Sequence, residues 1–364
     1  MRALRRGQTM LSAVVAFVAL TLGFVQPTNA AVGPYDNLYV FGDSLSDAGN
    51  VAAATGGAVP IFPFYPYGRF SNGLNYADVL SGKLGVNPIT IPTQGPALLP
   101  SLAPGQPGVP FPLGTNYAWG GALTGAAVSP LPASAVPTVL QQVGFYSLAR
   151  QQGLAADPNA LFVLWGGAND LRDAISYASA HPTQSFAIGD AVAANAVDNI
   201  KLALLGLKSQ GATTVLVPNL PDLGRIPETR ALDAADGAFP LAQYAAALTG
   251  LFNADLDAML SSFQGLSIKR LDVYALYNDA LDHPGKYQLD NVTDPCFQGT
   301  IASGGTSCST PNTYLFWDDL HPTARVGQIL GDAAFAAAVP EPETYALLAL
   351  GLALIIWVRV QRRG

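Results

Sequence analysis

The chain has 364 residues, a formal net charge of −7 and no long run of basic residues, which argues against a nucleic-acid partner. It contains only two cysteines and three histidines, and two cysteines without a histidine cluster do not make a zinc site. We find no heptad run and no internal repeat, so the length between the two ends suits one large α/β domain.

The first 30 residues have the order of a secretory signal peptide. Three arginines precede an apolar run over residues 11–25, and small residues follow up to Ala30. The apolar run is shorter than the roughly 20 residues that a membrane-spanning helix needs, which argues against an anchor. We therefore predict export and removal of residues 1–30 by a signal peptidase.

Short apolar runs then alternate with longer segments of helical character. The strand candidates are residues 37–41, 161–165, 213–217 and, more weakly, 268–273. The helix candidates are residues 74–84, 139–152, 187–209 and 241–263. This alternation is typical of a parallel sheet that helices cover on both faces, with ligands at the carboxyl ends of the strands.

Residues 85–114 break the alternation, because they are rich in proline and glycine and carry only scattered apolar side chains. Irregular segments of this length are usually binding loops or disordered. We expect Ile89, Leu98, Leu99 and Phe111 to help form an apolar mouth for an acyl group. A flexible surface loop is the alternative.

Cys296 and Cys308 are an even pair that closes a short loop. The predicted export places this pair in an oxidising compartment. Such a pair in such a compartment predicts a disulfide.

The histidines bear on catalysis, because a serine nucleophile needs a base within hydrogen-bond reach and usually a carboxylate that orients the base. All three, His181, His283 and His321, are followed by proline. Only His321 has an aspartate three residues earlier, Asp318. Since Pro322 suits the first turn of a following helix, we expect His321 on a loop at or near the helix cap.

Four sequence blocks together resemble the GDSL (SGNH) esterase/lipase family. Residues 41–50, FGDSLSDAGN, resemble the first block in its long-chain form, and residues 67–73, YGRFSNG, resemble a segment common in that branch. The other three blocks are similar, in the expected order, to residues 116–122, 166–170 and 317–323.

The resemblance implies the SGNH hydrolase fold over residues 31–338, a flavodoxin-like three-layer α/β/α sandwich with a parallel five-stranded sheet. It also implies a serine hydrolase that cleaves carboxylic esters through an acyl-enzyme intermediate, without cofactor or metal; the long loop favours lipid or aryl esters. One alternative is an extracellular polysaccharide O-acetyl esterase that acts on acetylated glycan. The other is a non-catalytic surface or matrix protein on a hydrolase scaffold.

The same resemblance implies three catalytic residues. Ser44 would be the nucleophile, His321 the general base and Asp318 the carboxylate that orients the base. Asp319 stays open as an alternative to Asp318. Asp43 is expected to buttress the nucleophile turn.

The oxyanion hole would combine the backbone N–H groups of Ser44 and Gly121 with the side-chain amide of Asn169. A side chain at Gly121 is expected to block the close approach of the backbone. Because two glycines are adjacent here, Gly120 stays open as the donor in place of Gly121.

Residues 339–364 resemble the PEP-CTERM sorting signal, which has a Pro-Glu-Pro box, an apolar helix and a basic tail. The resemblance implies processing by an exosortase, transient membrane tethering, and delivery to the cell surface or outside the cell. A single-pass tail anchor is the alternative, since an apolar run with a basic flank suits one too, although it needs no Pro-Glu-Pro box.

Overall fold

The computed structural model describes residues 34–86, 114–236 and 239–339, together with residues 350, 351, 358, 359 and 361. The expected signal peptide lies outside the described residues, as do Ile89, Leu98, Leu99, Phe111 and most of the expected sorting signal. In the part of the chain that is described, no helix is long and apolar enough to cross a membrane.

Four parallel strands form the central sheet, in the order β1-β2-β3-β4. Their bounds are β1 Leu38–Gly42, β2 Leu161–Trp165, β3 Thr214–Pro218 and β4 Ser267–Leu271. Every residue of β1 and β2 is buried, as expected for strands that are covered on both faces, whereas β4 is partly exposed at the sheet edge. The predicted parallel α/β sheet is confirmed, and each strand candidate lies within two residues of an observed strand.

The predicted count of five strands is wrong for the described residues. Residues 115–119 do run parallel to β1 at the outer edge of the sheet, with hydrogen bonds from Val40 N–H to Thr115 O (3.0 Å) and from Tyr117 N–H to Val40 O (2.7 Å). They form only one isolated bridge, however. The side chain of Asn116 accepts the N–H of Ala118 at 2.9 Å, and this local bond competes with a regular ladder.

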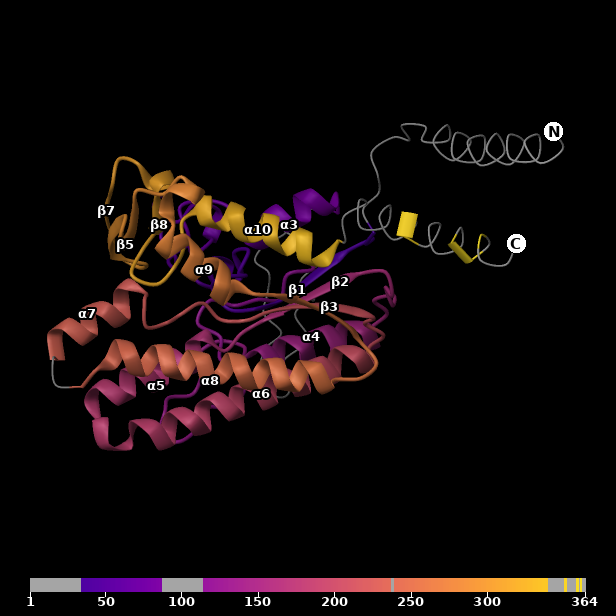
Figure 1. The fold of residues 1–364 in the computed structure, drawn as a ribbon, viewed down its shortest axis with the longest axis horizontal. Coiled ribbons are helices and arrows are strands. Elements are labelled where there is room, and N and C mark those ends of the chain that lie inside the picture. The colour runs from indigo at the N-terminus through magenta and orange to yellow at the C-terminus, as the bar shows by residue number, and fades with distance from the viewer. Residues whose placement is uncertain are drawn as a thin grey trace. The chain divides into compact units, whose positions relative to one another are not determined.

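Helices cover both faces of the sheet. Figure 1 shows α3, α9 and α10 on one side of the sheet and α4, α5, α6 and α8 on the other. The helix bounds are α2 Asn50–Ala54, α3 Tyr76–Leu84, α4 Val139–Gln151, α5 Ala168–Ala180, α6 Ser185–Ser209, α7 Pro227–Asp236, α8 Leu241–Ser262, α9 Val273–Asp282 and α10 Ala324–Ala338. Capping boxes begin α3 at Asn75 and α4 at Thr138, and both helices lie within the predicted segments 74–84 and 139–152.

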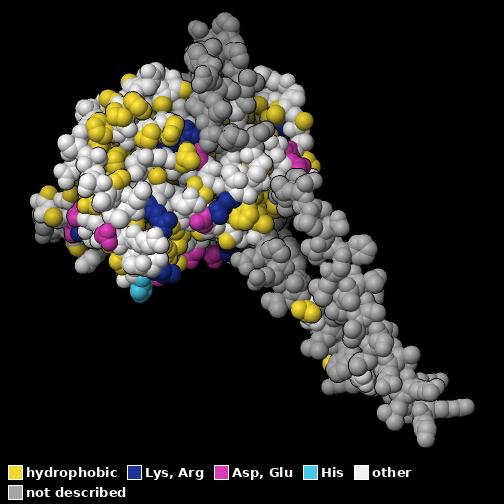
Figure 2. All heavy atoms as spheres, turned by 90° about the horizontal axis from the view of Figure 1, so that it is seen from above, with side chains coloured by type: hydrophobic (Ala, Val, Ile, Leu, Met, Phe, Trp, Pro, Cys, Tyr) yellow, Lys and Arg dark blue, Asp and Glu magenta, His cyan; other side chains and the backbone are white. Residues whose placement is uncertain are grey.

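Charged side chains are dispersed on the surface. On the face that Figure 2 shows, acidic and basic side chains of the described residues are interspersed. No large patch of one sign is visible there among the described residues.

A small hairpin carries the predicted disulfide. Strands β6 (Phe297–Thr300) and β7 (Gly304–Ser307) pair antiparallel, and the bond between Cys296 and Cys308 closes the hairpin, with the two Cα atoms 5.0 Å apart. Beside it, β5 (Asn291–Pro295) pairs in parallel with β8 (Tyr314–Phe316). The disulfide therefore fixes the segment that leads into the last sequence block.

Replacing both cysteines with serine should lower the free energy of unfolding by about 3 kcal/mol, because the crosslink restricts a short loop of the unfolded chain. Denaturant titration of the double variant, with the wild-type protein in reductant as the matched control, would measure this loss. Identical midpoints with and without the crosslink would contradict the prediction.

Candidate active site

The turn that follows β1 presents Ser44. The N–H groups of Ser46 and Asp47 donate to the carbonyl oxygen of Asp43 at 3.0 and 2.9 Å, and the N–H of Leu45 donates to Asp43 Oδ1 at 3.0 Å. Burial raises the pKa of Asp43 to about 6. Asp43 thus builds the turn with its backbone and its side chain, as expected.

A buried amide clamps the end of β1. The N–H of Gly42 donates to Gln142 Oε1 and its carbonyl accepts from Gln142 Nε2, both at 2.9 Å. A Cβ atom at Gly42 would lie 2.4 Å from the carbonyl oxygen of Trp165, so only glycine fits between β1 and β2 at this point. Gln142, on α4, therefore holds the residue from which the nucleophile turn starts.

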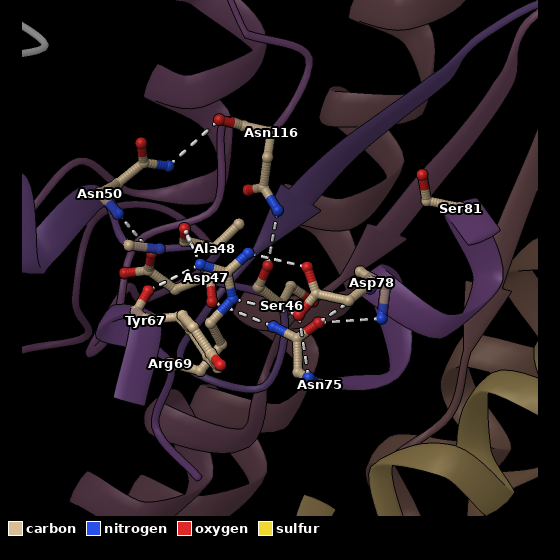
Figure 3. Close-up of polar contacts among 12 residues, drawn as sticks. Ser46, Asp47, Ala48, Asn50, Tyr67, Arg69, Asn75, Asp78, Ser81 and Asn116 are labelled. Atoms are coloured by element: carbon tan, nitrogen blue, oxygen red, sulfur yellow. Dashed lines mark hydrogen bonds and ion pairs between the residues drawn. The ribbon is translucent and has the colours of Figure 1, made fainter. Parts of the chain in front are cut away.

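A buried arginine ties three segments around this turn, as Figure 3 shows. Arg69 is 1% exposed, and its guanidinium donates to both oxygens of Asp78 at 2.8 and 3.1 Å. It also donates to the carbonyl oxygens of Ala48 at 2.7 Å and Tyr67 at 2.6 Å. The ion pair itself is shielded from water, and through it Arg69 joins α3, the loop around Tyr67 and the chain just after Ser44.

Two further amides in Figure 3 hold the backbone of the same turn. Asn75 Nδ2 donates to the carbonyl oxygen of Asp47 at 3.0 Å, and Asn116 Nδ2 donates to that of Ser46 at 2.7 Å. Ser44 therefore stands on a frame of buried hydrogen bonds from α3 and from the edge segment of the sheet.

His321 and Asp318 lie next to Ser44. His321 Nε2 is 2.8 Å from Ser44 Oγ, and His321 Nδ1 is 2.9 Å from Asp318 Oδ2. Burial alone would raise the pKa of Asp318, but His321 and the backbone N–H groups that donate to the carboxylate hold this pKa below its usual range. The three side chains form a continuous chain of hydrogen bonds from the Asp318 carboxylate through His321 to the Ser44 hydroxyl.

The other candidates for these two roles lie elsewhere. His181 stacks on Tyr177, His283 pairs with Asp279 at 3.0 Å, and both histidines are exposed. Asp319 is exposed, and its carboxylate makes no hydrogen bond to any described residue. Of the two adjacent aspartates, only Asp318 contacts the histidine.

The loop that carries His321 differs from expectation in one detail. Thr323 caps α10, its side chain accepts the N–H of Val326, and the helix begins at Ala324. Pro322 therefore lies before the cap and not in the first helical turn, because a threonine hydroxyl satisfies an orphan N–H group and proline does not. His321 is on the loop, as predicted.

The candidate donors of the oxyanion hole differ in whether a protein acceptor already binds their N–H groups. Asn169, in the first turn of α5, donates through Nδ2 to the carbonyl oxygen of Ala122 at 3.0 Å, which leaves its second N–H. The backbone N–H groups of Ser44 and Gly121 have no acceptor among the described residues. The N–H of Gly120, in contrast, donates to a carboxylate oxygen of Asp47 at 2.9 Å and is already used.

The expected steric reason for glycine at position 121 is wrong. A Cβ atom there would meet only a methyl group of Val136, at 4.0 Å. Gly121 instead has a backbone φ of +82°, in the left-handed region that residues other than glycine rarely adopt.

Ser44, Asn169 and His321 line one pocket together. The pocket is also lined by Arg172 and Asp43, and Arg172 forms an ion pair with Glu228 at 2.6 Å. Most of the other lining residues are apolar: Leu45, Trp165, Ala168, Pro221, Leu223, Ile226, Val273, Leu320 and Leu330. The hydroxyl of Ser44 therefore faces a cleft with a mostly apolar wall.

Residues 38–334 match the family of GDSL-like lipases and acylhydrolases. The chain belongs to this family. Residues 338–363 match the PEP-CTERM protein-sorting motif. Both resemblances drawn from the sequence are thereby confirmed.

The relatives include bacterial and plant proteins. The chain is 30% identical over 338 residues to the esterase EstA of Pseudomonas aeruginosa, covering 84% of this chain and 47% of EstA. It is 32% identical over 332 residues to a Pseudomonas putida protein from the trpE-trpG intergenic region, covering 84% and 49%. The chain thus spans about half the length of these relatives. A GDSL-family lipolytic protein of Veillonella parvula aligns with a TM-score of 0.40 and 13% identity, covering 82% of this chain and 95% of that one.

The GDSL-family blocks converge in space. Residues 41–50 contain the end of β1 and the turn after it, residues 166–170 follow β2, and residues 116–122 extend past the edge of the sheet beside β1. All three leave the sheet at its carboxyl end, where parallel sheets place their sites. Residues 317–323 follow β8, which lies outside this sheet.

Two residues that support the site could not be predicted from the sequence. Gln142 clamps Gly42, and the hydroxyl of Tyr65 donates to Asp318 Oδ2 at 2.8 Å. Neither lies in a GDSL-family block quoted from the sequence. Both act through contacts about 100 and 253 residues apart, and a local pattern carries no signal of such contacts.

Proposed function

We propose that this protein is an exported serine hydrolase that cleaves carboxylic esters through an acyl-enzyme intermediate. The observation that carries the proposal is the relay in which His321 Nε2 lies 2.8 Å from Ser44 Oγ, with Asp318 hydrogen-bonded to the far side of the ring. This is the arrangement that makes a serine hydroxyl a nucleophile near neutral pH.

The reaction has two halves. His321 Nε2 takes the proton from Ser44 Oγ while the oxygen attacks the ester carbonyl, and it then gives that proton to the departing alcohol. In the second half, His321 takes a proton from water, whose oxygen attacks the acyl carbon, and returns a proton to Ser44 as the carboxylic acid leaves. Asp318 stabilises the imidazolium that forms in each half.

The oxyanion of each tetrahedral intermediate would accept hydrogen bonds from the N–H groups of Ser44 and Gly121 and from Asn169 Nδ2. The two backbone N–H groups have no other acceptor among the described residues, which supports this role. Gly120 is not proposed, since its N–H is bonded to Asp47.

The apolar wall of the pocket favours lipid or aryl esters over acetylated glycans. Hydrolysis of p-nitrophenyl esters from acetyl to palmitoyl by the purified protein would test the function and its substrate class together. We expect turnover to rise beyond the butyryl ester. Activity on acetyl esters alone would favour a polysaccharide O-acetyl esterase, and no hydrolysis of any ester by folded protein would refute the proposal.

We also propose that residues 1–30 direct export and are removed by signal peptidase, that residues 31–338 form the hydrolase domain, and that residues 339–364 are processed by an exosortase at the surface. The PEP-CTERM match supports the last step. The mass of the mature protein from its native host would show whether both ends are removed, and retention of the C-terminal segment would identify a tail anchor.

Replacing Asn169 with alanine should lower kcat about 100- to 1,000-fold with little change in KM, because the lost donor acts on charge that exists only in the transition state. Asn195→Ala is the matched control, since Asn195 is half-buried, donates to Ala126 O at 2.9 Å and does not line the pocket that holds Ser44. A raised KM with unchanged kcat would assign Asn169 to substrate binding instead.

A further inference from the structure

Tyr65 reaches the predicted catalytic carboxylate from a distant part of the chain. It lies just before the short 3-10 helix η1 (Pro66–Gly68) and is 1% exposed. Its hydroxyl donates to Asp318 Oδ2 at 2.8 Å. Burial, followed by the charge of Asp318, raises the pKa of Tyr65, so this hydroxyl keeps its proton near neutral pH and can donate.

Both oxygens of Asp318 face the imidazole, since His321 Nδ1 lies 3.0 Å from Oδ1 and 2.9 Å from Oδ2. Their other partners differ. Oδ1 accepts the backbone N–H groups of Leu320 at 2.9 Å and His321 at 2.6 Å, which belong to its own turn. Tyr65 is the only other described residue that donates to Oδ2, so the hydroxyl shares this oxygen with the imidazole.

The hairpin with the disulfide holds the ring of Tyr65 in place. The ring packs edge-on against Phe297 of β6 and against Trp317, with centroid distances of 5.5 and 6.3 Å. The N–H of Tyr65 donates to Ile61 O at 3.1 Å, and the N–H of Ile61 donates to Ile301 O, at the tip of the hairpin, at 2.8 Å. The position of the hydroxyl is thus set by the hairpin and the segment around Ile61, together with Trp317, the neighbour of Asp318.

We propose that Tyr65 is a positioning residue for the proposed ester hydrolysis: its hydroxyl fixes the Asp318 carboxylate and draws part of its negative charge away from His321. The proposal rests on the proposed function for its consequences in turnover, but not for its effect on His321 itself.

Removing the hydroxyl should have two consequences. The carboxylate loses a donor that fixes its orientation, so kcat should fall roughly tenfold with KM unchanged, the scale of one hydrogen bond to a charged group. The remaining negative charge then acts more strongly on the imidazole and stabilises its protonated form. The acid limb of the pH profile of kcat/KM should therefore move to higher pH, by about half a unit.

The test compares Tyr65→Phe with Tyr244→Phe in the otherwise unchanged protein. Tyr244 is the matched control because it is buried and its hydroxyl donates to Ser185 O at 2.8 Å, between α6 and α8. Each variant loses one buried tyrosine hydrogen bond, and thermal unfolding should show similar losses. Only Tyr65→Phe should lower kcat and shift the acid limb.

Nuclear magnetic resonance gives a readout that does not depend on turnover. The chain has three histidines, and only His321 is buried, so its ring nitrogens can be followed through a pH titration. Tyr65→Phe should raise the midpoint of His321 and leave the midpoints of His181 and His283 unchanged. If the wild-type protein hydrolyses no ester, the proposed function fails, but this titration still decides the role of Tyr65.

A second variant guards against a general loss of structure. Phe297→Leu keeps the Tyr65 hydroxyl but loosens the packing of the Tyr65 ring, so it should shift the titration midpoint of His321 in the same direction by a smaller amount.

A double variant tests whether the effect passes through Asp318. In an Asp318→Asn background, Tyr65→Phe should lower kcat much less than tenfold, because its effect passes through Asp318. An unshifted His321 midpoint in Tyr65→Phe, or an equal loss of kcat in both backgrounds, would overturn the proposal.

Discussion

We expect Ser44→Ala to lower kcat for ester hydrolysis by about 10⁶-fold, because serine, base and carboxylate act as one unit and the covalent route is lost with the hydroxyl. Ser44 Oγ lies 2.8 Å from His321 Nε2, and the frame around the turn consists of other residues, so the variant should fold normally. Steady-state hydrolysis of a p-nitrophenyl ester measures the loss.

Covalent labelling checks the same assignment independently. A fluorophosphonate should modify Ser44 of the wild-type protein, as seen by peptide mass, and should not label the alanine variant. Ser147→Ala is the matched control, since the hydroxyl of Ser147 bonds to Val143 O at 3.0 Å within α4. Full activity in Ser44→Ala, or labelling at another serine, would show that the nucleophile has been misassigned.

The second large effect is expected for Asp318→Asn, with a fall in kcat of about 10⁴-fold. An amide at this position can donate to His321 Nδ1, which favours the tautomer that carries its proton on Nε2. That tautomer cannot accept the proton of Ser44. The amide also has one acceptor oxygen where the carboxylate has two, so an amide NH2 group in place of Oδ2 would break the hydrogen bond from Tyr65 as well.

Asp319→Asn is the matched control for this substitution. Asp319 is the next residue along the chain, it is exposed, and its side chain makes no hydrogen bond to any described residue. We expect its kcat to stay within about threefold of wild type, in the range of ordinary surface changes. A large loss in Asp319→Asn with little change in Asp318→Asn would exchange the roles of the two aspartates.

Much of the scaffold could be predicted from local patterns. Residues 161–165 were predicted as a strand and form β2 with the same bounds, because five consecutive apolar residues have few alternatives to a strand buried on both faces. The helix predicted over residues 139–152 is α4, Val139–Gln151, whose start is set by the Thr138 cap. The helix α5 was not predicted, since it begins at Ala168 directly after the glycines of a sequence block and has no side-chain cap.

The sequence by itself determined the residue types of the candidate site and the family to which the chain belongs, because those depend on motifs within a few residues of each other. Only the tertiary structure shows that Asp318 and not Asp319 contacts His321, and that Gly121 rather than Gly120 has an available N–H group. It alone reduced the fifth strand to a single bridge and brought Tyr65 to Asp318. Each of these outcomes depends on which donor reaches which acceptor across the fold, and a contact between residues 253 positions apart leaves no local trace in the chain.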